Sequence, residues 1–291
     1  MTIAINTVLL KIKAYAELLK LRLATLVAFS GAFGYSLAIK QINWMSLIVF
    51  VLAAFAITGA ANIINQIIER DLDKLMKRTQ NRPLPSGRVN VQEAVWLAMI
   101  LFGVATTVFV LFFNLRAAGL AVLSTILYGF VYTPLKRVGP IAVFVGAIPG
   151  AFPPMIGWVA ATNQFGLEPG ILFAIQFFWQ FPHFWAIAWV LDEDYKKAGF
   201  RLLPSKGGKD INTAIQIMIY TLFLLPVSWL PYELGMTGIK SVMVAMIFGV
   251  LFLAQTFHLM RKCTDKTALQ LMFGSFAYLP IVQIAYLLDK I

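Results

Sequence analysis

The chain has 291 residues, of which 60% are hydrophobic and only 13% are charged. Because soluble domains carry about 25% charged residues, this composition predicts an integral membrane protein without a separate soluble domain. The formal net charge of +11 does not indicate a nucleic-acid partner, since basic residues of membrane proteins gather on their cytoplasmic face. The single cysteine, Cys263, excludes an internal disulfide and a metal cluster built from cysteines.

Residues 1–20 form an amphipathic segment that we expect to lie on the surface of the lipid bilayer. Residues 21–291 are predicted to form a single all-α transmembrane domain. Apolar stretches of about 20 residues, the length that crosses a bilayer, occur nine times in this domain. They lie at 21–39, 47–68, 93–113, 117–133, 141–161, 170–190, 212–231, 239–260 and 268–288. We expect the nine helices to surround a central apolar cavity.

The connections between the spans predict how the chain sits in the membrane. Residues 114–116 alone separate the third and fourth spans, which indicates a tight helical hairpin. Gly and Pro recur through the fifth span, so we expect it to be interrupted and to face protein or a cavity. All Lys and Arg residues except Lys40, Arg116, Lys240 and Lys290 fall on one side of the membrane. This asymmetry predicts a cytoplasmic N-terminus, cytoplasmic long loops and residence in the cell (inner/plasma) membrane.

The most unusual stretch covers residues 62–88 and mixes acidic, basic and amide side chains between two apolar spans. Asn65, Glu69 and Asp73 recur every four residues, so a helix would present them on one stripe and Asp71 on another face. Oxygen ligands stacked at a helix end suit a hard cation such as Mg²⁺. A basic cytoplasmic loop is the simpler interpretation, but it does not explain the acidic stripe.

A second acidic cluster, residues 192–194, directly follows the sixth span and is itself followed by basic residues. Two acidic clusters on one membrane face can hold Mg²⁺ between them, and a diphosphate bound to that metal becomes a good leaving group. The pattern does not exclude Glu193 as a ligand. The predicted catalytic and metal-binding residues are Asn65, Glu69, Asp73, Asp192 and Asp194. The predicted diphosphate-binding residues are Lys74, Arg78, Arg82, Tyr132, Lys136, Arg137, Lys196 and Lys197.

Aromatic residues are concentrated before the second cluster, between Phe177 and Trp189. Their ring faces could stabilise the allylic cation that forms when a diphosphate leaves, and they could exclude water. For most of them, an aromatic belt at the membrane interface is the simpler interpretation. Tyr132 is different, because it lies four residues before Lys136 in the loop that follows the fourth span.

Several stretches resemble one known family, the UbiA superfamily of intramembrane prenyltransferases. They are the acidic stripe, NRPLPSGR (81–88), YTPLKR (132–137), GAIPGAFPPMIGW (146–158), PHFWAIAW (182–189) and EDYKKAGFRLLP (193–204). They follow the family's order through spans two to six, and the resemblance weakens after about residue 211. The last two stretches resemble the branch of the family that acts on heme. Two departures are Glu69, where the family usually has Asp, and Leu21, where the family has Pro before the arginine.

The resemblance implies a UbiA-like fold and a Mg²⁺-dependent transfer of a farnesyl group from farnesyl diphosphate to a vinyl group of heme b. Water addition then gives heme O, and diphosphate is released. The resemblance also implies heme contacts for His183, Trp185 and Arg22, with His183 as an axial ligand or near a propionate. A downstream heme-modifying enzyme or a terminal oxidase assembly is an implied partner.

Two other functions remain open from the residues alone. A prenyltransferase that acts on an aromatic acid or quinone precursor would need the same acidic clusters. A membrane transporter would also have broken apolar spans and polar residues within them. The acidic residues argue against a transporter, because they gather at one membrane face instead of the midplane.

Overall fold

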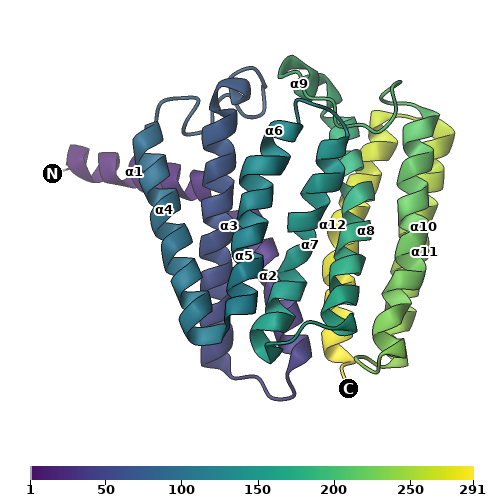
Figure 1. Ribbon diagram of the computed structural model, residues 1–291. Coiled ribbons are helices and arrows are strands. Elements are labelled where there is room, and N and C mark those ends of the chain that lie inside the picture. The colour runs from purple at the N-terminus through teal and green to yellow at the C-terminus, as the bar shows by residue number, and fades with distance from the viewer. Residues whose placement is uncertain (1) are drawn as a thin grey trace.

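The computed structural model describes residues 2–291 and the side chains of residues 9–291. Long helices stand side by side as a bundle, and α1 lies across it near one end (Figure 1). The α-helices are α1 (Thr2–Leu19), α2 (Leu21–Ala38), α3 (Trp44–Asp73), α4 (Val91–Val108), α5 (Leu115–Ile126), α6 (Thr133–Leu135), α7 (Ile141–Thr162), α8 (Leu167–Val190), α9 (Asp192–Lys197), α10 (Ile211–Glu233), α11 (Ile239–Lys262) and α12 (Asp265–Leu288). Two π-helical segments, η1 (Phe109–Phe113) and η2 (Leu127–Tyr132), continue α4 and α5.

Nine helices within residues 2–291 are long and apolar enough to cross a membrane, which confirms the nine predicted spans. The largest difference concerns α3, which continues past the predicted end at residue 68 to Asp73. The predicted hairpin between the third and fourth spans is also confirmed. Its connecting residue, Asn114, caps α5 by accepting a hydrogen bond of 2.8 Å from the Ala117 N–H.

Helices α2 and α7 pack with their backbones in contact at glycine positions. A Cβ atom at Gly34 would lie 1.9 Å from the Pro154 carbonyl oxygen, and one at Gly157 would lie 1.9 Å from the Gly31 carbonyl oxygen. Only glycine allows this approach, as is common where membrane helices pack closely. The contact fixes α2, whose first residues adjoin the candidate site, against the centre of the bundle.

Helix α7 is continuous although three prolines lie inside it, so the predicted interruption of the fifth span is wrong. A proline provides no N–H for the carbonyl four residues earlier. Side chains of neighbouring helices replace two of the missing donors. The Pro149 carbonyl accepts a hydrogen bond from Ser124 Oγ (3.2 Å), and the Gly150 carbonyl accepts one from Gln176 Nε2 (2.7 Å). The helix therefore keeps its course because its buried neighbours satisfy the freed carbonyls.

The chain turns sharply between α1 and α2 at Lys20, whose φ of 52° is left-handed. This turn leaves carbonyls at the end of α1 without helical partners. Two amide side chains of α3 take them: Asn62 Nδ2 donates to Leu19 O (3.1 Å) and Gln66 Nε2 donates to Leu18 O (2.7 Å). These bonds attach α1 to α3 and place the Lys20 side chain beside the acidic stripe.

The α3–α4 loop, α6 and α9 all lie at the same end of the bundle, near α1 (Figure 1). We call this the site end. The sequence predicted that these segments share one side of the membrane, and their common location agrees with that prediction. That this end faces the cytoplasm stays a prediction.

Candidate active site

The acidic stripe lies on the buried face of α3 at the site end. Asn65, Glu69 and Asp73 are 1%, 4% and 0% exposed, whereas the Asp71 side chain is 69% exposed. The predicted stripe and the separation of Asp71 from it are therefore confirmed. Buried carboxylates are costly unless they are paired, so their partners decide what the stripe can do.

Each of the two buried carboxylates on α3 faces a basic side chain from another segment. Lys136 Nζ lies 2.8 Å from Glu69 Oε1, and Arg82 Nη1 lies 3.0 and 2.8 Å from the two carboxylate oxygens of Asp73. Burial alone lowers the pKa of Lys136, but the nearby Glu69 carboxylate raises it above its ordinary value. Lys136 therefore stays charged beside the stripe.

Glu69 is held by this pairing, because its buried Oε1 atom lies 2.8 Å from Lys136 Nζ. Buried carboxylate and amide oxygens are also the ligands that a hard cation such as Mg²⁺ prefers. Within the described chain, no three acidic, histidine or cysteine side chains lie close enough together to hold an ion. Basic side chains stand against the carboxylates instead.

The second acidic cluster begins with a buried residue. Asp192 is 7% exposed, and Lys196 Nζ lies 2.7 Å from its Oδ2 atom. The Glu193 side chain is 77% exposed and contacts Lys196 at 3.2 Å. Of these two acids, only Asp192 repeats the pattern of Glu69 and Asp73, which is a buried carboxylate with one basic partner.

Asp194 has a different role, because it joins the two acidic segments. Its Oδ1 and Oδ2 atoms accept the backbone N–H groups of Lys77 (2.9 Å) and Arg78 (3.1 Å), directly after α3. Burial raises the pKa of the Asp194 carboxyl, but these amides and the Lys197 ammonium outweigh it and hold the pKa below its usual value. The two acidic segments therefore meet, as the sequence predicted.

Two residues that the sequence analysis missed hold the Asn65 side chain. Asn65 Nδ2 donates to Thr133 Oγ1 (3.0 Å), and Lys20 Nζ donates to Asn65 Oδ1 (3.2 Å). Burial, and then the positive charges of Arg82 and Lys136, lower the pKa of Lys20 to about 7. Two features of the sequence could have identified them: Thr133 lies inside the YTPLKR stretch, and Lys20 lies directly before the first span.

Tyr132 lies beside the same group of charges. Lys136 Nζ is 4.7 Å from the centre of the Tyr132 ring, which agrees with the predicted link between the two residues. The ring packs over Gly146, where an added Cβ would lie 2.6 Å from it. Tyr132 ends the π-helical segment η2, and such segments occur frequently at functional sites.

The other predicted diphosphate-binding residues lie farther from the buried carboxylates. Lys74 pairs with the exposed Asp71 at 3.0 Å, on the wrong side of α3 for the stripe. Lys197 pairs with Asp194 at 3.1 Å, and the Arg78 and Arg137 side chains are exposed. The structure thus brings Arg82, Tyr132, Lys136 and Lys196 to the acids and leaves these four basic residues at the rim.

The predicted heme contacts are not brought together. His183 Nδ1 hydrogen bonds with Ser275 Oγ (2.9 Å), and its ring stacks on Trp179 with centroids 4.4 Å apart. Trp185 is two residues farther along α8 and therefore on the opposite face. Its ring packs at 5.2 Å against Tyr220 of α10. The two side chains lie on opposite faces of α8, and their contacts with heme stay a prediction.

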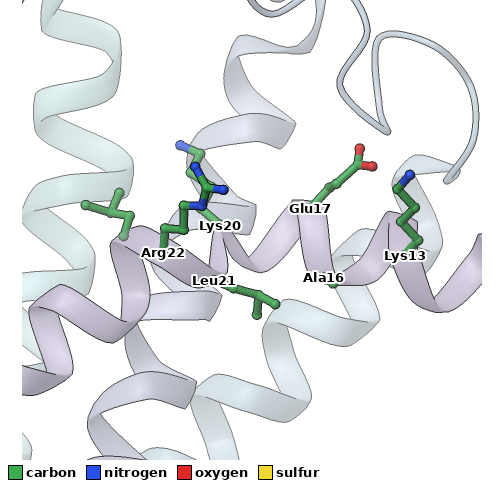
Figure 2. A pocket seen from close by; sticks show the side chains of 7 residues that line it. Lys13, Ala16, Glu17, Lys20, Leu21 and Arg22 are labelled. Atoms are coloured by element: carbon green, nitrogen blue, oxygen red, sulfur yellow. The ribbon is translucent and has the colours of Figure 1, made fainter.

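Arg22 lines a hollow of about 390 Å³ at the turn between α1 and α2 (Figure 2). Figure 2 shows Arg22 and Lys20 reaching to the same side, while Leu21 points away from them. A second hollow of about 330 Å³ is lined by residues of α10 and α11, including Trp229. Neither is the expected central apolar cavity, which stays a prediction.

This arrangement matches a known family. The model of the UbiA prenyltransferase family matches residues 27–279. The chain belongs to this family. A protein from Cytophaga hutchinsonii named protoheme IX farnesyltransferase is 57% identical to this chain, over 96% of this chain and 98% of the relative. A protein of the same name from Flavobacterium psychrophilum is 48% identical, over 95% and 94% of the two chains.

Solved structures show the same UbiA fold. A structure described as digeranylgeranylglyceryl phosphate synthase superposes with a TM-score of 0.80 at 24% identity, over 96% of this chain and 98% of that one. A UbiA homologue from Archaeoglobus fulgidus, bound to GPP and Mg²⁺, gives a TM-score of 0.62 at 14% identity, over 94% and 99% of the chains. At such identities these likenesses concern the fold alone.

Proposed function

We propose that this chain transfers a farnesyl group from farnesyl diphosphate to heme b and forms heme O. The observation that carries the proposal is the 57% identity, over nearly the whole of both chains, with a protein named protoheme IX farnesyltransferase. The C1–oxygen bond of farnesyl diphosphate breaks, and the terminal carbon of a heme vinyl group bonds to C1. Water adds to the other vinyl carbon and loses a proton, so heme O and diphosphate are the products.

We assign Mg²⁺ as the cofactor, held by Asn65, Glu69, Asp73 and Asp192. These side chains offer buried oxygen ligands, which a hard cation prefers. When bound, Mg²⁺ would neutralise charge on the diphosphate and make it a better leaving group. Asp194, predicted as a further ligand, is assigned an anchoring role instead, because both of its oxygens accept backbone N–H groups.

The basic residues fit the diphosphate. Arg82, Lys136 and Lys196 each contact a buried carboxylate, so their N–H donors are within the site and can turn to phosphate oxygens. The four rim residues, Lys74, Arg78, Arg137 and Lys197, add positive potential that attracts an anionic substrate. The Tyr132 ring lies 4.7 Å from the Lys136 ammonium and helps to hold this cation in the site.

For heme, we assign a contact to His183. Its Nδ1 atom is hydrogen-bonded to Ser275 Oγ, so Nε2 is the nitrogen that can contact the heme. Arg22 is assigned to a heme propionate, and Trp185 to packing between α8 and α10. The chain would reside in the cell inner membrane, with residues 1–20 on the surface of the lipid bilayer and the site end in the cytoplasm. A downstream heme-modifying enzyme or a terminal oxidase assembly would receive heme O.

The test uses purified protein with heme b, farnesyl diphosphate and Mg²⁺, and mass analysis of the heme product. Heme O is the expected product. Prenylation of 4-hydroxybenzoate without any heme product would assign the enzyme to the quinone branch. Solute flux through liposomes without prenyl transfer would make it a transporter. Absence of heme O under conditions in which a known family member forms it would overturn the proposal.

A further inference from the structure

The hydrogen bonds around Thr133 run in a single direction. The Thr133 hydroxyl lies 2.8 Å from the Tyr128 carbonyl oxygen and 3.0 Å from Asn65 Nδ2. A carbonyl can only accept, so the one hydroxyl proton of Thr133 goes to Tyr128. Toward Asn65, the hydroxyl oxygen can then only accept. The group of Asn65 that faces Thr133 must therefore be the amide NH₂.

The opposite side of the Asn65 amide is constrained as well. With its NH₂ group turned to Thr133, Asn65 presents Oδ1 on this side, where Lys20 Nζ donates to it at 3.2 Å. Asn65 is thus held between an acceptor and a donor, with its oxygen on the side of Lys20. Asn65, Glu69 and Asp73 share the buried stripe of α3, so this oxygen belongs to the same group of candidate ligands as the two carboxylates.

Orientation matters at Asn65 and not at the other two positions of the stripe. The carboxylates of Glu69 and Asp73 present oxygen whichever way they turn, whereas a rotated amide would present NH₂, which cannot ligate a metal ion. Thr133 is 2% exposed and is followed directly by Pro134, in the short helix α6 after η2. Its buried position keeps the hydroxyl beside Asn65.

We propose that Thr133 is a positioning residue for the metal site, whose hydroxyl fixes the Asn65 amide so that its oxygen faces the cation. The inference rests on the proposed Mg²⁺ site and deepens it. Thr133 acts through Asn65 and does not itself contact metal or substrate. Losing the hydroxyl frees the amide to rotate, so the expected loss is in metal affinity.

The test compares variants of Thr133 by electron paramagnetic resonance titration of Mn²⁺ into purified protein with inorganic diphosphate. Thr133→Val keeps the side-chain shape without the hydroxyl and should bind Mn²⁺ about three- to tenfold more weakly, the size of one hydrogen bond. Thr133→Ser keeps the hydroxyl and should bind within about twofold of the wild type. Thr125→Val is the matched control, because the buried Thr125 hydroxyl donates only to Ala121 O within α5.

A second background separates orientation from packing. In Asn65→Asp, both ends of the side chain are oxygen, so adding Thr133→Val should cause no further loss of Mn²⁺ affinity. Equal losses in the wild-type and Asn65→Asp backgrounds, or wild-type affinity of Thr133→Val, would overturn the inference. If Thr133→Val does not fold, as judged by thermal unfolding, Thr133→Ala replaces it with the same expected outcomes. If the wild type binds no Mn²⁺, the proposed metal site itself is overturned. If the wild type and Thr133→Val bind Mn²⁺ equally well, only the orienting role of Thr133 is overturned.

Discussion

Asp194 and Arg78 are 116 residues apart in the chain, and the Arg78 N–H donates a 3.1 Å hydrogen bond to Asp194 Oδ2. The neighbouring Lys77 N–H donates to Asp194 Oδ1 at 2.9 Å. One carboxylate thereby fastens α9 to the first residues after α3. The two acidic segments are held together by backbone groups, independently of any bound ion.

Replacement of Asp194 should therefore affect stability as well as activity. Asp194→Ala removes two hydrogen bonds to a charged acceptor, which should cost about 1–3 kcal/mol in the free energy of unfolding. Asp192→Ala removes a carboxylate whose partner, Lys196, has a 58% exposed side chain and can turn to water. It should lower heme O formation with less loss of stability. Thermal unfolding in detergent measures the stability of both variants, and product analysis measures their heme O formation. Equal stability of the two variants would contradict the anchoring role of Asp194.

A comparison of Asp73 with Asp71 tests the stripe. The Asp73 side chain is 0% exposed and paired with Arg82, so Asp73→Ala should destabilise the fold as well as lower activity. Asp73→Asn keeps the shape and should lower turnover on the order of 100-fold or more, since even residues behind metal ligands contribute about 10–100-fold. Asp71→Asn, on the exposed face, should stay within about twofold. Similar losses of turnover in both Asn variants would argue against the stripe as the metal site.

The close packing of α2 on α7 can be tested with alanine. In Gly157→Ala, the new Cβ would meet the Gly31 carbonyl at 1.9 Å, so the helices must separate at a cost of about 1–3 kcal/mol. Gly103→Ala is the matched control, because nothing lies within 4 Å of a Cβ there. It should be neutral or stabilising by up to about 1 kcal/mol, through higher helix propensity. Melting temperatures that rank the two variants the other way would refute the backbone contact.

Asp210 should give the protein a defined pH dependence. It caps α10 by accepting the Thr213 N–H at 2.8 Å. Burial raises the pKa of its carboxyl, but the Ser205 hydroxyl and the Thr213 amide outweigh this and lower it. A lowered pKa in the folded state means that the stabilisation is complete above the unfolded value of about 3.9 and is lost as pH falls below it. Asp210→Asn should melt lower than the wild type at neutral pH, and the gap should narrow below about pH 4; a constant gap would contradict this.

His183 and Trp185 should differ in their effect on heme. His183→Ala should raise the KM for heme b and alter the absorption spectrum of bound heme, because the imidazole is the proposed contact. Trp185→Phe retains an aromatic ring against Tyr220 of α10 and should leave that spectrum unchanged. Titration of heme b into each purified variant provides the measurement. A spectral change in Trp185→Phe alone would reverse the assignment.

The spans, the hairpin at Asn114 and the stripe of Asn65, Glu69 and Asp73 could all be predicted from the sequence. Each depends on a local pattern, either apolar length or helical spacing. Lys20 and Thr133 could not be predicted as partners of Asn65, because 45 and 68 residues separate them from it and packing alone brings them close.

The wrong expectation, the interruption of the fifth span, has a cause of the same kind. Prolines in α7 predicted an interruption, but the donors that prevent it come from Ser124 and Gln176 on other helices. His183 and Trp185 are close in sequence but lie on opposite faces of α8, because two residues along a helix turn a side chain to the opposite face. Local sequence thus specified the elements, while contacts between elements decided which side chains share a site.

Lys290 restrains the end of α2 that lies farthest from the site. Its ammonium donates to the carbonyls of Ser36 (2.7 Å) and Ile39 at the end of α2 farthest from the site. At the other end, Lys20 is hydrogen-bonded to Asn65, and between them Gly34 abuts the α7 backbone. Because α2 is held at both ends and at its middle, it cannot slide along its own axis. Helix α2 should therefore keep its position relative to α3 and α7 when a substrate binds.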